Sequence, residues 1–296
     1  MTQAIIPSRL RPIGAVLFLL LCAAMPARAN GQVVAVNPDS LEYWLGPDDD
    51  VPEPLQWRLS TGLDFSAGDY GLDEPSESWQ QSVNLTAARG RWTLGVSTSY
   101  QRFSGPALDL DIFEDAVAFE DALFTGDIFT RRTVKGFGDT SVALRYDMTD
   151  ALTSGWLTSA ALKVKLPTAD RSAGLGSGHT DVTLGADTVR LLGRWSVFGS
   201  GAYTLRGESA ADPRRDTWSA SLGADYRLDR LWRVGVALDH RTLSRPDGGG
   251  TSDIYAFARL RLNDRLALTG YGLAGLDRNS PDLSVGLRLS WRFTQP

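Results

Sequence analysis

The amino-acid sequence predicts an all-β protein, a transmembrane up-and-down antiparallel β-barrel of about 12 strands. Three observations predict this fold. Apolar residues recur at every second position from Leu55 onward, tryptophans fall near the ends of the alternating segments, and short connections alternate with longer ones. A soluble β-sandwich shares the first property, so the tryptophans and the connections decide between the two.

Residues 1–29 have the features of a secretory signal peptide. An apolar run from Ile13 to Ala24 is followed by Pro26-Ala27-Arg28-Ala29, with small residues where a signal peptidase cleaves. The run is shorter than the roughly 20 apolar residues that span a bilayer, so a membrane-anchor helix is not expected. Cys22 lies inside the signal, and the mature chain from Asn30 contains no cysteine. Disulfides and cysteine-based metal sites are therefore excluded.

Twelve windows show the period-two alternation, and each has about the length that a tilted strand needs to cross a bilayer. In residues 282–293, Leu287 and Trp291 share one face, while Arg288 and Ser290 share the other. Apolar residues facing lipid and polar residues facing the interior are typical of membrane barrels. The windows are 55–66, 78–88, 91–103, 138–149, 155–166, 179–190, 194–206, 216–228, 232–243, 253–263, 265–276 and 282–293.

Eight of the 9 tryptophans lie on the apolar face of their strand and within a few residues of a strand end. Indole rings favour the headgroup region of a bilayer, where an apolar body and one N–H donor are both satisfied. A sandwich core would place these rings in the middle of strands, so they favour the barrel. They are Trp57, Trp79, Trp92, Trp156, Trp195, Trp218, Trp232 and Trp291.

The connections between windows provide an independent test. Counted from a periplasmic N-terminus, even-numbered connections such as 88–91 are tight, whereas odd-numbered ones such as 104–137 are mostly longer. Outer-membrane barrels have short periplasmic turns and longer external loops. We therefore expect a barrel over residues 55–293 in the bacterial outer membrane, with both ends in the periplasm. Residues 30–54 would form a periplasmic extension or a plug, and residues 294–296 a C-terminal tail.

The long external loop 104–137 departs from the period of two. Ile112, Phe119 and Leu123 fall on one stripe of a helix, with acidic residues opposite. We expect a short amphipathic helix that folds inward as an eyelet or packs across the opening as a lid. Its acidic face favours a solvated helix over a metal site, and no metal or other cofactor is expected. The candidate gate residues are Phe113, Phe119 and Phe124.

The polar strand faces would bring about twice as many basic as acidic groups into the interior. One hypothesis is a basic lumen that concentrates anions such as carboxylates or phosphates. The other is a network of cross-strand ion pairs that fills the interior, which we favour for most of these residues in a barrel this small. The net charge of −5 provides no continuous basic face for nucleic acid. The candidate constriction residues are Arg145, Lys163, Arg259 and Arg261, expected near mid-strand, with Lys165 and Arg227.

The middle of the chain contains three motifs: Gly136-Phe137-Gly138-Asp139, Lys165-Leu166-Pro167-Thr168-Ala169-Asp170 and Gly174-Leu175-Gly176-Ser177-Gly178-His179-Thr180-Asp181. Together they resemble the outer-membrane transporter family associated with the meta-pathway of phenol degradation, which is distantly similar to long-chain fatty acid channels. The resemblance covers roughly residues 136–206. It implies a channel through which small aromatic, apolar or anionic solutes cross the outer membrane. The family-like positions are Gly136, Gly138, Asp139, Pro167, Gly176, Gly178 and Asp181.

An enzyme is the main alternative, and the two histidines bear on it. Ser177, His179 and Asp181 share one strand face, but side chains two positions apart lie about 7 Å from each other, too far for direct hydrogen bonds. His240 has lipid-facing parity, and no serine is expected beside it. We therefore expect no catalytic residues and keep two alternatives, a lipid or ester hydrolase and a closed structural or adhesive barrel. The expected neighbours of His240 are Leu238, Thr242, Ile254 and Ala256.

The expected partners are outer-membrane lipids, a small-molecule solute and the barrel-assembly machinery. Residues 283–293 resemble the C-terminal signal that this machinery reads, although Thr294-Gln295-Pro296 follow the final aromatic residue. We expect a monomer.

Overall fold

The computed structural model describes residues 54–69, 75–105, 132–149, 155–208, 213–244 and 249–294. In these residues the chain forms a single sheet of antiparallel strands, and no helix among them is long and apolar enough to cross a membrane. The strands are β1 (Gln56–Gly68), β2 (Ser76–Arg89), β3 (Trp92–Gly105), β4 (Arg132–Phe137), β5 (Thr140–Asp147), β6 (Trp156–Leu166), β7 (Asp181–Leu192), β8 (Trp195–Leu205), β9 (Thr217–Arg227), β10 (Trp232–Thr242), β11 (Gly250–Arg261), β12 (Leu266–Gly275) and β13 (Leu283–Thr294).

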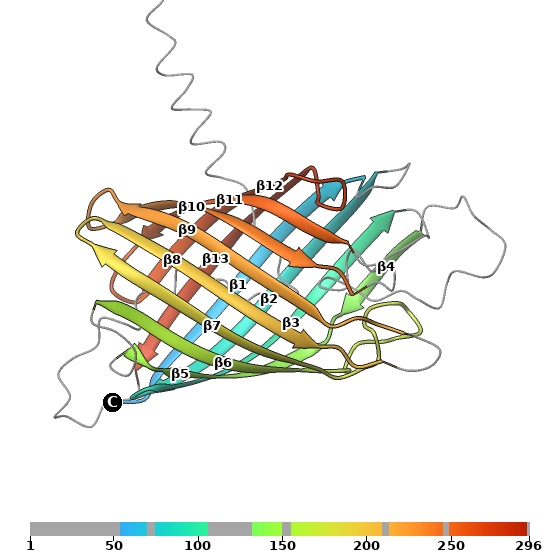
Figure 1. The fold of residues 1–296 in the computed structure, drawn as a ribbon, viewed down its shortest axis with the longest axis horizontal. Helices are drawn as coiled ribbons and strands as arrows, with labels where there is room; N and C mark the ends of the chain where they lie inside the picture. Colours follow the sequence, from blue (N-terminus) through green and yellow to red (C-terminus); the bar gives the residue numbers. More distant parts are fainter. Residues whose placement is uncertain are drawn as a thin grey trace, which may run out of the picture.

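β1 closes the sheet into a barrel, because it pairs with β13 on one side and with β2 on the other (Figure 1). In this closing pair Leu63 lies opposite Leu287, and Asp64 lies opposite Gly286. β4 and β5 pair with successive stretches of β3, so they are two halves of one barrel strand. The barrel therefore has 12 strand positions, which confirms the predicted architecture.

The two ends of the barrel differ in their connections. Tight turns at 90–91 and 193–194 lie at one end, called here the turn end, and Gly90 (φ 54°) and Gly193 (φ 70°) provide the left-handed residue of each. Connections such as 167–180 and 276–282 lie at the other, the loop end. In Figure 1 the turn end is on the left and the loop end on the right. The connection 148–155 is the one even-numbered connection that is not tight.

The predicted loop 104–137 is partly strand, which corrects its boundaries. β3 continues to Gly105, and β4 begins at Arg132. The prediction missed β4 because the alternation is interrupted at Gly138 and Asp139, between the two halves of the strand. The helix expected in this loop, with Phe113, Phe119 and Phe124, lies outside the described residues.

A β-bulge causes this interruption. Ser97 lies opposite Ser141, but Tyr100 lies opposite Phe137, so three steps along β3 match four steps along the partner strand. The extra residue shifts the register by one and exchanges the inward and outward faces between β5 and β4. The Gly138 N–H still donates to the Ser99 carbonyl, 2.8 Å away.

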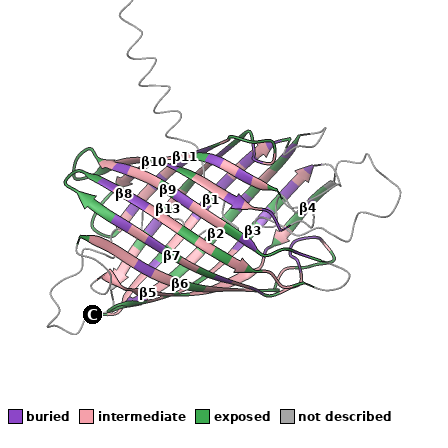
Figure 2. Ribbon diagram, viewed as in Figure 1, coloured by how far each residue is buried: buried purple, intermediate pink, exposed green. Residues whose placement is uncertain are grey.

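Along the strands exposed residues alternate with buried ones (Figure 2), and the exposed residues of the outer surface are largely apolar, as the alternation predicts. On β10 the outward Val236 and Leu238 are 56% and 55% exposed, whereas the inward Ala237 and Arg241 are 5% and 8% exposed. Aromatic pairs form a band near each end of this surface, as expected for rings at the two membrane interfaces. The turn-end pairs are Trp92–Tyr146, Trp195–Tyr226 and Trp291–Phe293, and the loop-end pairs are Phe65–Trp79, Tyr100–Phe137 and Trp218–His240.

The interior is less polar than the sequence analysis predicted. A cluster of apolar side chains, called here the apolar belt, covers the inner wall formed by β6–β8 and β10–β12. Glycines on neighbouring strands make room for its rings: a Cβ on Gly223 would collide with the Phe198 ring, and one on Gly235 with the Phe257 ring. The rings therefore lie against the wall. The belt consists of Val189, Phe198, Ala237, Phe257 and Tyr271, with Leu157 and Tyr255 packed against them.

This packing predicts that Gly235→Ala destabilises the barrel. The added methyl would overlap the Phe257 ring and lie 2.8 Å from the Asp225 Cβ, so both must move. Overpacking of this kind costs about 1–3 kcal/mol. The free energy of unfolding in detergent, measured by urea titration, tests the loss. Gly201→Ala is the matched control, because its Cβ would meet nothing nearer than the Ser219 carbonyl at 3.9 Å. Equal stability of the two variants would contradict the packing.

Candidate functional site

A network of buried ions lies inside the loop end. Asp181, the first residue of β7, accepts from Lys165 Nζ at 2.9 Å and from Arg206 Nη1 at 3.1 Å. Its other carboxylate oxygen accepts from the Gly207 N–H at 3.0 Å. Lys165 also lies 3.3 Å from the carboxylate of Asp139. The side chains in these pairs are at most 16% exposed, so each charge depends on its partner.

This network fastens the connection 167–180 against the inside of the barrel mouth. Asp139 accepts from the Ala169 N–H at 2.9 Å, and Lys165 Nζ donates to Ser177 Oγ at 2.9 Å. Leu175 is buried, and its carbonyl accepts from Gln101 Nε2, an inward side chain of β3, at 3.2 Å. The connection therefore packs into the lumen.

Two family-like glycines leave space for this inward fold. A Cβ on Gly136 would collide with the Leu175 side chain, and one on Gly176 would lie 3.0 Å from both carboxylate oxygens of Asp139. The bulge beside Gly138 turns Asp139 inward. The structure thus brings these residues and Asp181 to one place, although their motifs are separated in the sequence.

The remaining family-like positions shape the connection itself. Gly178 has a φ of 73°, a conformation that glycine adopts without strain. Pro167 is exposed at the end of β6. In the same connection the Ser172 hydroxyl donates to Asp170 at 2.6 Å, and this hydrogen bond lowers the pKa of the Asp170 carboxyl below its usual value. The carboxylate form is therefore the one that shapes this turn.

Two further ion pairs lie deeper in the barrel. Arg145 contacts Asp187 at 2.5 Å, and Ser159 Oγ donates to the other oxygen of Asp187 at 2.9 Å. Arg233 contacts Asp225 at 2.8 Å. Both aspartates are inaccessible to solvent. Of the candidate constriction residues, Arg145 is thus held in an ion pair, and Lys163 lies on the same inner face, opposite Ala143 and Thr183.

The other basic candidates lie nearer the turn end than expected. Arg261, which was expected near mid-strand, is the last residue of β11, and Arg227 is the last residue of β9. Both are exposed at the rim, where Arg261 pairs with Asp264 at 2.5 Å. Arg259 is buried and lies opposite Arg233. The predicted window 253–263 ran two residues past the end of β11, and Arg261 was therefore misplaced along the barrel axis.

The apolar belt is the interior feature that the sequence analysis missed. Tyr255 and Phe257 have ring centroids 5.7 Å apart, and those of Tyr255 and Tyr271 are 6.0 Å apart. The Tyr271 hydroxyl donates to Asp64 at 2.7 Å, and the guanidinium of Arg288 lies over its ring at 5.4 Å. The sequence did contain a signal for the belt. Aromatic residues occur on the polar face of several strands, and the neighbouring strands have glycines at the opposite positions.

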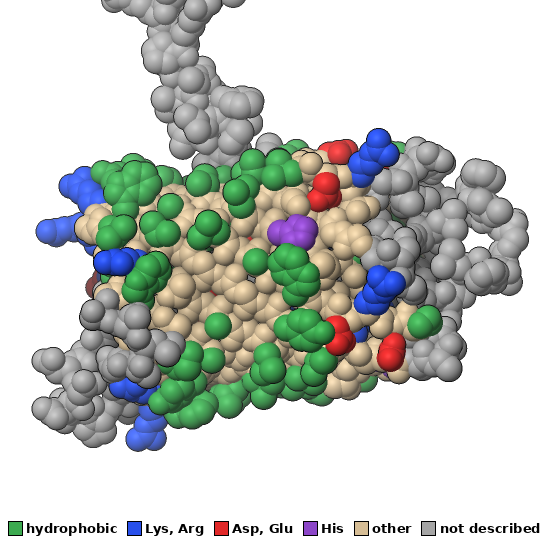
Figure 3. All heavy atoms as spheres, viewed as in Figure 1, with side chains coloured by type: hydrophobic (Ala, Val, Ile, Leu, Met, Phe, Trp, Pro, Cys, Tyr) green, Lys and Arg blue, Asp and Glu red, His purple; other side chains and the backbone are tan. Residues whose placement is uncertain are grey.

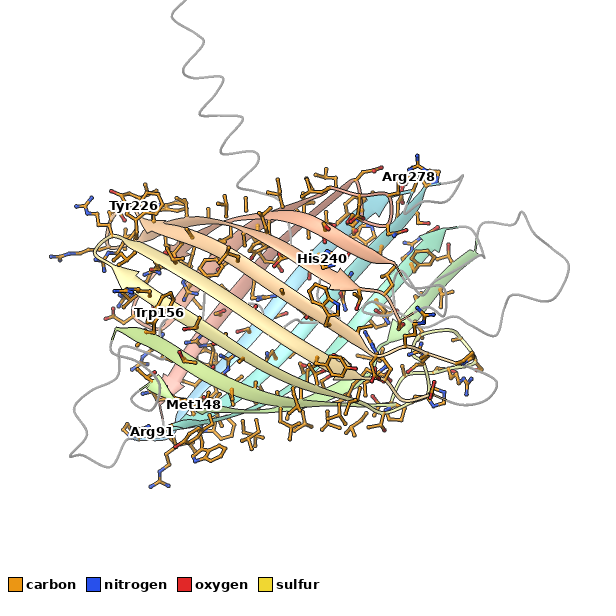
Figure 4. All side chains as sticks on the ribbon, in the orientation of Figure 1. Arg91, Met148, Trp156, Tyr226, His240 and Arg278 are labelled. Atoms are coloured by element: carbon orange, nitrogen blue, oxygen red, sulfur yellow. The ribbon has the colours of Figure 1, made fainter. Side chains whose placement is uncertain are left out.

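On the outer face, the structure corrects the expected surroundings of His240. Ser252 lies directly opposite it on β11, and Ser252 Oγ is 2.9 Å from His240 Nδ1. The prediction failed because β11 begins at Gly250, before the expected window at 253. Figure 4 labels His240, and Figure 3 shows a histidine on the outer surface beside hydrophobic side chains. A serine and a histidine are therefore in contact on the lipid-facing side.

The other histidine makes a different contact with serine. Ser177 Oγ accepts from the His179 backbone N–H at 3.2 Å, and Asp181 is held by Lys165 and Arg206. Ser177 itself is buried in the network and bonded to Lys165. These side chains therefore act as structural parts of the inward connection.

Comparison with protein families gives one match. The family described as "Putative MetA-pathway of phenol degradation" matches residues 105–293, more than half of the chain. This match includes the three motifs and the apolar belt. Comparison with curated proteins gives no significant match.

Solved structures with the same architecture include an outer membrane channel from Pseudomonas putida F1. It has a TM-score of 0.63 and 18% sequence identity, over 84% of this chain and 100% of that chain. The KdgM porin has a TM-score of 0.47 and 7% identity, over 80% of this chain and 99% of its own. The toluene transporter TodX of P. putida has a TM-score of 0.43 and 10% identity, over 92% and 98%. The first of these likenesses shows the fold.

The loop-end network predicts that Asp181→Asn loosens the inward connection. The change removes the carboxylate that Lys165 and Arg206 share, although Lys165 keeps Asp139, and removing one partner of a buried pair costs about 3 kcal/mol. We expect trypsin to cleave the folded variant after Arg171 faster than the wild type, with the fragments identified by mass spectrometry. Asp264→Asn, which affects the exposed pair with Arg261, should leave cleavage at Arg171 unchanged. Equal cleavage of Asp181→Asn and wild type would refute the anchoring.

Proposed function

The chain belongs to this MetA-pathway phenol-degradation family, and on that premise we propose that it is a channel for small organic solutes in the bacterial outer membrane. The closed barrel and its apolar outer surface with two aromatic bands support the location. The name of the similar P. putida structure, an outer membrane channel, agrees with this function.

The apolar belt is the observation that carries the proposal. A barrel that serves only as a water-filled pore has a polar lumen, whereas here Phe257 and Tyr271 are buried on the inner wall at 2% and 1% exposure. These rings are already packed on the wall, so an apolar or aromatic solute that displaces them gains the free energy of burial and of ring contacts in their place. The opposite wall stays polar, with Gln80 and Gln101 directed inward. One wall therefore suits the solute's ring, and the other suits water and polar groups.

The proposal includes a role for the predicted gate. Phe113, Phe119 and Phe124 belong to a connection that starts and ends at the loop end, after β3 and before β4. A short helix there would control entry from outside. This role stays a prediction, since these residues lie outside the described part of the chain.

Phe257→Ala tests the role of the belt. The purified protein in planar bilayers should conduct ions, and phenol should interrupt the single-channel current while it occupies the belt. Removing the ring widens the lumen and removes a stacking surface, so we expect a larger conductance and interruptions shortened by about three- to tenfold. Phe65→Ala is the matched control, because the Phe65 ring packs on Trp79 at the outer surface.

The outcome that would refute a channel is equally direct. A wild-type protein that folds and inserts, as judged by a heat-modifiable gel shift, but neither conducts nor responds to phenol would favour a closed structural or adhesive barrel. If the current interruptions shorten equally in Phe257→Ala and Phe65→Ala, phenol does not bind at the belt.

A hydrolase of the outer leaflet is a second candidate, because of the contact between Ser252 and His240. A serine hydroxyl within hydrogen-bonding distance of an imidazole is the nucleophile–base pair of ester hydrolases. The His240 ring contacts Ser252 and the Trp218 ring, the latter at 4.9 Å between centroids. Neither is the carboxylate or amide that orients the base in such enzymes, so the channel remains the better supported function.

Covalent labelling tests the hydrolase. A reactive Ser252 in detergent-folded protein should label with a fluorophosphonate probe, and His240→Ala should abolish labelling by removing the base. Ser196→Ala, at an inward serine bonded to Arg233, is the matched control and should keep the label. Absence of labelling in the wild type would remove this candidate.

A further inference from the structure

The interior at the turn end contains a pocket lined by five arginines. It is a small hollow, open to solvent, between the ends of β11, β12, β13 and β1. Asp264 is the one acidic residue among its lining residues, and it is almost fully exposed. We call this site the arginine pocket. Its arginines are Arg58, Arg259, Arg261, Arg265 and Arg292.

The fold concentrates these arginines by placing small residues between them. On β12 the inward positions at this level are Ala267 and Thr269, and both are buried. Arg261 lies opposite Ala267, and Arg259 lies opposite Thr269. The inner face of β12 is therefore free of long side chains here. Arginines of β11 lie on one side of it, and arginines of β13 and β1 lie on the other. The small residues create the space that the guanidinium groups line.

This arrangement places like charges opposite each other. Arg58 lies directly across from Arg292 in the closing pair, and Arg259 lies across from Arg233. Like charges in cross-strand pairs are destabilising, and burial of a guanidinium adds to the cost. Arg58 and Arg259 are only 6% and 5% exposed. Arg233 is paired with Asp225, which offsets part of this repulsion, whereas Arg58 and Arg292 face each other directly across the seam.

The arginine pocket adjoins the apolar belt. Phe257, Arg259 and Arg261 follow each other at every second position of β11, so neighbouring side chains on this face lie about 7 Å apart. Tyr271, Thr269 and Ala267 follow in the same direction on β12. A solute about the size of one aromatic ring with an anionic substituent can thus reach a guanidinium while its ring displaces Phe257 from the wall.

We propose that the arginine pocket binds the carboxylate of small aromatic carboxylates while the ring lies against the belt, at the end of the pathway next to the periplasm. The inference rests on the proposed channel function and names its solute class. Arginine suits this ligand because its planar guanidinium can donate two parallel hydrogen bonds to one carboxylate. Figure 3 shows further Lys and Arg side chains projecting at this end, which would raise the local concentration of anions.

Binding and permeation can be measured separately, so the two proposals can fail separately. Benzoate is the probe at pH 8, where it is fully ionised, and benzyl alcohol is its neutral counterpart. Isothermal titration on the detergent-folded barrel measures binding. Bi-ionic reversal potentials with potassium benzoate and potassium chloride in planar bilayers measure permeation. Wild-type protein should bind benzoate more tightly than acetate or inorganic phosphate, because only benzoate also contacts the belt.

Arg259→Gln and Arg292→Gln should each weaken benzoate binding by about tenfold, the equivalent of about 1.4 kcal/mol, and lower its permeability relative to chloride. Benzyl alcohol, which has no carboxylate, should bind these variants and wild type with equal affinity. Arg58→Lys keeps the positive charge but removes the planar guanidinium with its paired donors. Its affinity for benzoate should therefore lie between that of wild type and that of the glutamine variants. Arg194→Gln is the matched control, since it removes one charge from a turn at the same end, outside the pocket. A heat-modifiable gel shift confirms folding, and Arg292→Gln carries the test if the buried Arg259 is needed to fold.

Each outcome is informative. Ion conductance without benzoate binding would overturn the arginine pocket and leave the channel standing. Benzoate binding that the arginine variants weaken, in a protein that does not conduct, would support the pocket and refute the channel. Equal affinity for benzoate, acetate and phosphate would overturn the aromatic part of the proposal. Unchanged affinity in both Arg259→Gln and Arg292→Gln would overturn it altogether.

Discussion

The pairing of β1 with β13 is the interaction on which the rest of the structure depends. Lipid cannot hydrogen-bond an exposed backbone, so a sheet in a membrane must leave no open edge. Twelve residue pairs, from Gln56 with Thr294 to Ala67 with Leu283, close this seam. Closure also fixes what each side chain can do. Along every strand alternate residues must face lipid, and the others must share a narrow interior, whatever their chemistry.

The barrel fills that interior in two ways. At the loop end and in the middle, acidic and basic side chains neutralise each other, as Asp181 does with Lys165 and Arg206. On the wall of β6–β8 and β10–β12, apolar rings lie over glycines. Buried ion pairs tolerate little rearrangement, because each charge left alone carries a large desolvation cost. The rings lose only packing when a solute displaces them, so the belt is the part of the wall that can yield.

The sequence predicted the barrel well because closure acts on every strand. Period two, tryptophan position and loop length all follow from the membrane, and the observed strands match the predicted windows to within a few residues apart from the first half of the bulged strand. What it could not supply is register. Ser252 was placed outside its strand by one residue, so its contact with His240 was not foreseen. Contacts between strands depend on turn geometry, which local patterns do not encode.

The same limit explains the misjudged interior. Alternation assigns Phe257 to the inner face but does not show that Gly235 lies opposite and accepts its ring. The three motifs were recognised as a family feature. In the structure the motifs form a bulge and an inward connection, which Lys165 joins. This role could not be predicted, because it depends on contacts between strands that are distant in the sequence.

Charge along the barrel axis then gives the pathway a direction. Ion pairs such as Arg206–Asp181 and Arg145–Asp187 lie from the loop end to the middle, and five arginines line the pocket at the turn end. A carboxylate bound in the proposed arginine pocket would therefore lie at the periplasmic end of the pathway. Conduction also requires release. The Arg261 side chain is 48% exposed, and Asp264 beside it is 92% exposed, so water and a competing carboxylate reach the outermost guanidinium. A bound carboxylate can thus be exchanged at the rim while Arg259, deeper in the wall, receives the next one.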